Sequence, residues 1–177
     1  MSEETRIEGK RILIVDDEQD VLESLEEILY MCLITKAISF QEAQKALEQK
    51  DFDVAILDIM GVNGYKLLDM AKERKILGIM LTAHALSPEE TVRSYRDGAA
   101  FFVPKEKMAK LPLFIGDVVE AKEKGENSWA TWLDSLGDHY TKRFGPNWQD
   151  SEKEFWDALK RQDWRLASVI RKQEDEM

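Results

Sequence analysis

The chain has 177 residues, enough for one domain with a full core and a modest extension, and its formal net charge is −10. This charge disfavours DNA as a partner, because nucleic-acid binding normally depends on a basic surface. The polar N-terminus lacks the apolar core of a signal peptide, and no apolar run approaches the roughly 18 residues of a membrane span. Cys32 is the single cysteine, so it can form no disulfide within the chain. We therefore expect a cytoplasmic protein without membrane association.

Short apolar segments alternate with amphipathic segments along most of the chain. Strands are predicted at 11–15, 33–38, 52–57, 76–81 and 99–103. Helices are predicted between them, where apolar residues recur at helical spacing. One helix has a clear start, because Ser87, Pro88 and Glu90 supply an N-cap, a first-turn proline and a capping-box glutamate. This helix should end near Gly98.

A fifth helix should cover most of residues 106–124, with Pro112 delaying its regular start or breaking it after one turn. Five strands that alternate with five helices are typical of a parallel sheet with helices on both faces. We therefore predict an α/β fold, a five-stranded doubly wound parallel sheet over residues 10–124, preceded by an N-terminal tail at 1–9.

Residues 125–177 form a tryptophan-rich segment that contains all five tryptophans, and it is predicted to be a small helical extension. One helical face, which Gly145-Pro146 should end, carries Trp129, Trp132, Leu133, Leu136, Tyr140 and Phe144. Ser151 and Glu154 are expected to form a capping box for a second helix, which follows Trp148 and contains Phe155, Trp156 and Leu159. A last helical segment should carry Trp164, Ala167 and Ile170. The aromatic residues either pack these helices together and onto the sheet, or form a partner-binding or dimer surface.

Polar residues follow four of the five predicted strands. Asp16 and Asp17 follow the first strand, Asp58 the third, Thr82 the fourth, and Lys105 lies just beyond the fifth. Carboxyl ends of parallel strands meet at one edge of a sheet, where functional groups gather. Three carboxylates are ligands that Mg²⁺ prefers, and a hydroxyl with an ammonium group can contact phosphoryl oxygens. Taken singly, the same residues could be helix caps, loop hydroxyls or surface charges.

The segments ILIVDDE, AILD, MLTA and GAAFFVPK, in this order and each at a strand end, resemble the receiver domain of bacterial two-component response regulators over residues 10–124. The resemblance implies a CheY-like, flavodoxin-like fold. It also implies that Asp58 accepts a phosphoryl group from the phosphohistidine of a histidine kinase or phosphotransfer protein. The expected output is a conformational change that signals to a downstream protein, so we expect a signalling protein and not an enzyme.

The same resemblance assigns roles to the other site residues. Mg²⁺, with Mn²⁺ as an alternative, would be bound directly by Asp17 and through water by Asp16, with Asp58 and the backbone carbonyl of Met60 as further ligands. Thr82 and Lys105 would hold the phosphoryl oxygens, and Thr82 and Phe102 would form the switch, although Phe102 is equally expected as fixed core.

Two local features differ from the family pattern. The acceptor is followed by IMGVNG, which places Gly64 six positions after Asp58 where the family has a glycine at eight, so the loop is shorter. The family favours a proline after the lysine, whereas here Pro104 precedes Lys105.

Two other functions remain open at this stage. One is a scaffold that keeps the fold without phosphorylation. The other is a phosphatase of the haloacid dehalogenase type, which also forms an aspartyl phosphate but needs an aspartate two positions after the nucleophile, where this chain has Met60. The sequence leaves open the cognate kinase, a homodimer and the role of the extension, although eight Lys or Arg against eleven Asp or Glu in it disfavour DNA binding.

Overall fold

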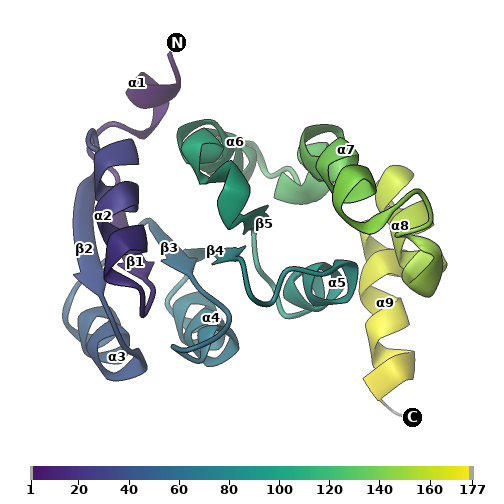
Figure 1. Ribbon diagram of the computed structural model, residues 1–177, viewed down its shortest axis with the longest axis horizontal. Coiled ribbons are helices and arrows are strands. Elements are labelled where there is room, and N and C mark those ends of the chain that lie inside the picture. The colour runs from purple at the N-terminus through teal and green to yellow at the C-terminus, as the bar shows by residue number, and fades with distance from the viewer. Residues whose placement is uncertain (1, 176–177) are drawn as a thin grey trace.

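The computed structural model describes residues 2–175, with side chains described as far as residue 169. One five-stranded sheet has the order β2-β1-β3-β4-β5, and every pairing in it is parallel (Figure 1). The strands are β1 (Arg11–Val15), β2 (Leu33–Ala37), β3 (Val54–Leu57), β4 (Leu77–Thr82) and β5 (Phe101–Pro104). The predicted α/β fold is confirmed, and the observed strands differ from the predicted ranges by no more than two residues at either end.

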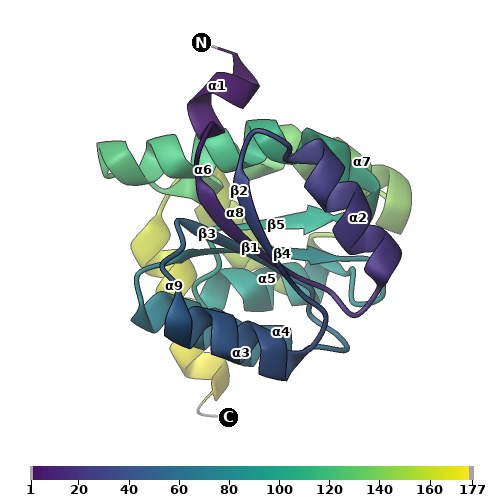
Figure 2. The ribbon, with the colours of Figure 1, turned by 90° about the vertical axis from the view of Figure 1, so that its left-hand side faces the viewer.

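Helices cover both faces of the sheet, as a doubly wound fold requires. They are α2 (Gln19–Ile28), α3 (Phe40–Gln49), α4 (Gly64–Glu73), α5 (Pro88–Arg96) and α6 (Leu111–Lys124). Helices α2 and α6 lie on one face, and α3, α4 and α5 lie on the other (Figures 1 and 2). Strand β3 is therefore buried at every residue, which explains why it reads as a continuous apolar run, VAIL.

The predicted helix starts near Pro88 and Pro112 are confirmed. The Ser87 hydroxyl accepts a hydrogen bond from the Glu90 N–H at 3.0 Å, with Pro88 as the first residue of α5. A 3-10 helix, η1 (Lys105–Lys110), precedes α6, so Pro112 lies in the first turn of α6 and the regular helix begins late.

A short helix, α1 (Glu3–Ile7), occupies the predicted N-terminal tail and packs on α6. The Arg6 guanidinium forms ion pairs of 2.9 Å with both Asp117 and Glu120, and Ile7 is fully buried. These partners lie more than 100 residues away along the chain, so local sequence patterns give no sign of the contact.

The helical extension packs beside the β5 end of the sheet, next to α5 and α6 (Figure 1). Its elements are the 3-10 helices η2 (Ser128–Thr131) and η3 (Asp150–Glu152) and the helices α7 (Trp132–Phe144), α8 (Lys153–Lys160) and α9 (Trp164–Asp175). Helix α7 ends at Gly145, which has a φ of 91°, as predicted. Trp129 lies in η2 and not in α7, and the side chain of Ile170 lies beyond those that the structure describes.

The predicted capping box at Ser151 and Glu154 is wrong. Glu152 is the N-cap of α8, and it makes no side-chain capping bond. The Ser151 hydroxyl instead donates to the carboxylate of Glu89 on α5, at 3.1 Å. Packing of the extension on α5 gives this hydroxyl a tertiary partner in place of a local one.

The extension and the sheet share one hydrophobic core. Trp129, Trp132, Trp148 and Trp156 have exposed fractions of 3%, 0%, 6% and 0%, and they belong to the same buried cluster as the sheet. This confirms, for these four residues, the interpretation that the tryptophans pack the helices together and onto the sheet. None of the helices in the described part of the chain has both the length and the apolar character needed to cross a membrane.

Candidate functional site

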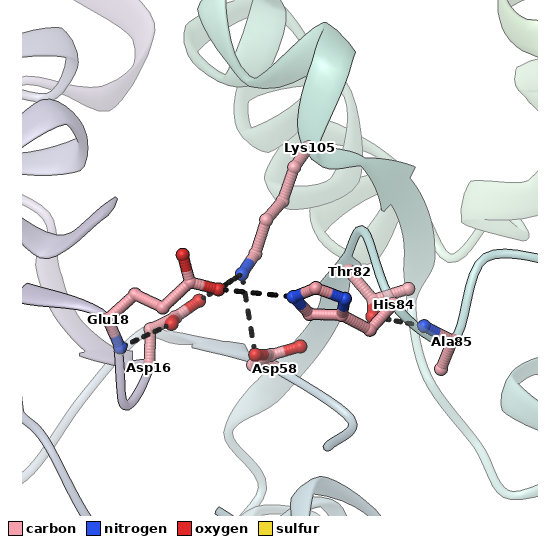
Figure 3. Close-up of polar contacts among 7 residues, drawn as sticks. All are labelled: Asp16, Glu18, Asp58, Thr82, His84, Ala85 and Lys105. Carbon is pink, nitrogen blue, oxygen red and sulfur yellow. Dashed lines mark hydrogen bonds and ion pairs between the residues drawn. The ribbon is translucent and has the colours of Figure 1, made fainter. Parts of the chain in front are cut away.

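The carboxyl edge of the sheet brings together side chains that are far apart in sequence (Figure 3). Asp16 follows β1 and Asp58 follows β3, and these two strands pair in register at Val15 and Leu57. Thr82 ends β4, and its partner in the register of β5 is Pro104, immediately before Lys105. Parallel pairing therefore places four of the predicted residues at one edge.

Lys105 is the cation at the centre of this group. Its ammonium lies 2.8 Å from Asp16 Oδ2 and 3.4 Å from Asp58 Oδ2, and the side chain is 10% exposed. Burial alone would lower the pKa of this ammonium, but hydrogen bonding and charge attraction from Asp16 and Asp58 outweigh burial and raise the pKa. Lys105 thus reaches both carboxylates, although the proline precedes it.

Asp58 is a buried carboxylate, with an exposed fraction of 3%. Burial raises its pKa, and the negative charge of Asp16 raises it further, whereas Lys105 and a hydrogen bond from the Thr82 hydroxyl act in the opposite direction. The result is a carboxylate that is more basic than usual and that has a cation and a hydroxyl donor beside it. These are the properties of a nucleophile held next to groups that can stabilise an anion.

An acidic cluster lies next to this carboxylate. Oxygen atoms of Asp16, Asp17 and Glu18 lie within 4.8 Å of one another, with Asp16 buried and the other two exposed. The Glu18 N–H donates to Asp16 Oδ1 at 2.9 Å, and Glu18 Oε1 lies 3.4 Å from the Lys105 ammonium. Hard oxygen ligands open to solvent fit Mg²⁺ or Mn²⁺, which keep several waters when bound.

Sequence reasoning assigned no role to two residues of this group. Glu18 was not assigned a role, although it directly follows the two aspartates. His84 Nε2 lies 3.6 Å from Glu18 Oε1, with 71% of the side chain exposed, so the imidazole stands at the rim of the site (Figure 3). Its position two residues after Thr82, just beyond a predicted strand, is that of an exposed loop residue near the rim, as the structure shows.

The short loop after Asp58 passes close to the acidic residues, and two glycines allow this. A Cβ atom at Gly64 would overlap the Asp58 carbonyl oxygen, and one at Gly61, where φ is +86°, would overlap the Asp17 carboxylate. The Met60 side chain points out and is 54% exposed. The role of its carbonyl as a metal ligand stays a prediction.

The two predicted switch residues are both buried. The Thr82 hydroxyl oxygen accepts a hydrogen bond from the Ala85 N–H at 3.2 Å. The Phe102 side chain is fully buried, and its backbone carbonyl accepts a hydrogen bond from Trp132 Nε1 at 2.9 Å. Thr82 therefore touches the loop before α5, and Phe102 touches the extension, while their movement stays a prediction.

Comparisons with known proteins bear on this same part of the chain. Residues 12–113 match the response regulator receiver domain family. Two curated relatives from Arabidopsis thaliana are two-component response regulator ARR18, 36% identical over 83 residues (44% of this chain, 13% of the relative), and ARR12, 34% identical over 105 residues (55% and 17%). The chain therefore spans less than a fifth of either relative.

Solved structures show the same likeness. A CheY-like response regulator receiver domain protein from Methanospirillum hungatei JF-1 is 31% identical, with a TM-score of 0.60, over 66% of this chain and 98% of that one. A receiver domain whose structure is described as BeF3-activated DrrB has a TM-score of 0.57 at 21% identity, over 63% of this chain and 98% of that one, and it supports the fold.

Proposed function

Because the chain belongs to the response regulator receiver domain family, whose members are signalling modules that are phosphorylated on aspartate, we propose that Asp58 accepts a phosphoryl group from a histidine kinase or phosphotransfer protein. The observation that supports this most directly is the buried Asp58 carboxylate, with the Lys105 ammonium 3.4 Å away and Thr82 at the same edge of the sheet. The phosphorylated chain then signals to a downstream protein through a conformational change.

The residues supply what an in-line phosphoryl transfer needs. An oxygen of ionised Asp58 attacks phosphorus, the O–P bond forms as the N–P bond of the donor breaks, and the imidazole of the donor leaves with the electron pair. No general base is required, because the carboxylate carries no proton to remove. The Lys105 ammonium and the Thr82 hydroxyl lie where they can contact the negative oxygens of the transferring group.

The acidic cluster is proposed to hold Mg²⁺, with Mn²⁺ as an alternative. Asp17 would bind the ion directly, Asp16 would act through water, and Asp58 and the Met60 carbonyl would be further ligands. When bound, the ion would neutralise charge on the phosphoryl oxygens and on the crowded carboxylates. Gly61 keeps the approach to Asp17 free of a side chain.

The chain is proposed to consist of an N-terminal tail (1–9), a receiver domain (10–124) and the helical extension (125–177). Gly125, with a φ of 69° at the end of α6, marks the second boundary. We also propose a cytoplasmic location, because the single cysteine can form no disulfide within the chain. The extension is acidic, so the expected downstream partner is a protein and not DNA.

Phosphorylation by a small donor tests the function without knowledge of the kinase. Acetyl phosphate with Mg²⁺ should add one phosphoryl group per chain, seen by intact mass as a gain of about 80 Da, because the acceptor carboxylate and its stabilising groups are all on this chain. Chelation of Mg²⁺ with EDTA should remove most of the gain. An unchanged mass after prolonged incubation with Mg²⁺ would contradict the proposed function.

Thermal unfolding tests the metal site separately. Mg²⁺ at about 100-fold above its Kd should raise the melting temperature by roughly 5–10 °C, because an ion that binds only the folded chain stabilises it by mass action. Asp17→Asn should remove most of this increase. Asp51→Asn is the matched control, since Asp51 is exposed and precedes β3 at the opposite edge of the sheet. An equal Mg²⁺ response in Asp17→Asn and wild type would rule out direct ligation by Asp17.

A further inference from the structure

The extension covers the β5 edge of the sheet. Strand β5 pairs with β4 on one side, and carbonyl groups in and just before β5 are bonded by the extension. Trp132 Nε1 donates to the Phe102 carbonyl at 2.9 Å, Trp129 Nε1 donates to the Ala99 carbonyl at 2.8 Å, and the Ser128 hydroxyl donates to the Ala100 carbonyl. An edge strand that would otherwise expose unpaired backbone groups is capped by side chains of the same chain.

A second contact joins the extension to α5. The hydroxyl groups of Tyr140 and Thr91 lie 2.6 Å apart, and both residues are fully buried. The Thr91 hydroxyl also bonds the Ser87 carbonyl at 2.8 Å. Its single proton is used there, so Tyr140 is the donor in the pair. Tyr140 on α7 is thereby connected, through Thr91, to the N-cap residue of α5.

The N-terminus of α5 is in turn connected to the phosphoryl-acceptor site. Thr82 ends β4 at the same edge of the sheet as Asp58, and its hydroxyl oxygen accepts a hydrogen bond at 3.2 Å from the N–H of Ala85, two residues before Ser87. A phosphoryl group on Asp58 would place its oxygens farther out than those of the free carboxylate. Thr82 would have to reorient to donate a hydrogen bond to this anion, and its bond to the Ala85 N–H would shift or break as it did so.

We propose that the extension is the output element of this receiver, and that the Tyr140–Thr91 contact passes the phosphorylation state of Asp58 to it. The inference rests on the proposed phosphorylation of Asp58. We assign the transmission of the signal to α5, because the loop before α5 is bonded directly to Thr82. The carbonyl groups of β5, in contrast, belong to a strand that is held by its pairing with β4. A ligand shifts only those states that it binds differently, so movement of α5 must alter the packing of α7.

Two readouts on the full chain can test this. All five tryptophans lie beyond residue 124, so indole emission reports on the extension alone. Mg²⁺ with acetyl phosphate should shift the emission of wild type and speed amide hydrogen exchange in residues 128–144 by about fivefold or more, the lower end of typical coupling between sites. Intact mass measured on the same sample gives the phosphorylated fraction.

Tyr140→Phe is the decisive variant. It keeps the ring and leaves the Thr91 proton bonded to the Ser87 carbonyl, so the chain should fold and gain the same phosphoryl mass as wild type. Both responses of the extension should fall to less than about half of the wild-type change, since the coupling contact is lost. Tyr30→Phe, at an exposed tyrosine (73%), is the matched control and should respond as wild type does.

The outcomes separate the two proposals. A chain that gains no phosphoryl mass would overturn the proposed function and this inference with it. A chain that gains the mass without any change in emission or exchange would overturn the inference alone. A full response in Tyr140→Phe would overturn the route through α5 and would leave the β5 contacts to carry the signal.

Discussion

Asp58→Asn is expected to abolish the phosphoryl mass gain that wild type shows with Mg²⁺ and acetyl phosphate. An amide is a far weaker nucleophile than a carboxylate, and Asn at this position keeps the size and shape of the side chain. The other buried carboxylate at the site, Asp16, is engaged by Lys105 at 2.8 Å and by the Glu18 N–H at 2.9 Å, so it is not expected to replace Asp58. Asp51→Asn, which changes an exposed carboxylate elsewhere, should label as wild type does. Full labelling of Asp58→Asn would make another residue the acceptor.

The same variant should be more stable than wild type in metal-free buffer at neutral pH. The pKa of Asp58 is raised in the folded state, first by burial and then by Asp16. A raised pKa means that the contribution of this carboxyl to stability is fully present below its unfolded pKa and is lost as the pH rises through the folded pKa. Asn carries no charge, so it avoids this loss, and Lys105 keeps its ion pair with Asp16.

Urea denaturation in EDTA measures this difference. The advantage of Asp58→Asn in free energy of unfolding should be largest near neutral pH and should shrink as acid protonates Asp58 in wild type. A variant that is less stable than wild type at neutral pH would contradict the electrostatic account of the site. The predicted loss of phosphoryl labelling in Asp58→Asn does not depend on this electrostatic account.

Trp132→Ala is expected to lower the free energy of unfolding by about 3–5 kcal/mol, the usual cost of replacing a large buried aromatic residue by alanine. Trp132 is fully buried, stacks on Trp156 with ring centroids 5.6 Å apart, and meets the ring of Tyr140 edge-on at 4.8 Å. The substitution also leaves the Phe102 carbonyl without its indole donor, which adds the cost of an unsatisfied buried acceptor.

Trp164→Ala provides the matched control, because Trp164 is only partly buried, on α9. It should cost much less than Trp132→Ala. Since the extension and the sheet share one core, far-UV circular dichroism and tryptophan emission should report a single transition in wild type. Two separate transitions, or a loss in Trp132→Ala no larger than that in Trp164→Ala, would show that the extension contributes little to the stability of the sheet.

Much of the site could be predicted from local pattern. Once the strands are recognised as parallel, the residues that follow them must meet at one edge, and Asp16, Asp58, Thr82 and Lys105 do so. The start of α5 was predictable for a similar reason, since its capping bond joins Ser87 to a residue three positions away. Interactions that are set by strand order or by near neighbours can be inferred from the sequence alone.

Tertiary contacts decided the rest. Ser151 carries the pattern of a helix cap, yet its hydroxyl bonds Glu89, 62 residues away, and Arg6 holds α1 on α6 through partners that no local pattern reveals. The tryptophans favoured a core but left a binding surface open, because apolar periodicity shows which face of a helix is buried but not what covers it. That choice depends on long-range packing, in which burial of apolar area and pairing of buried polar groups outweigh weak local preferences.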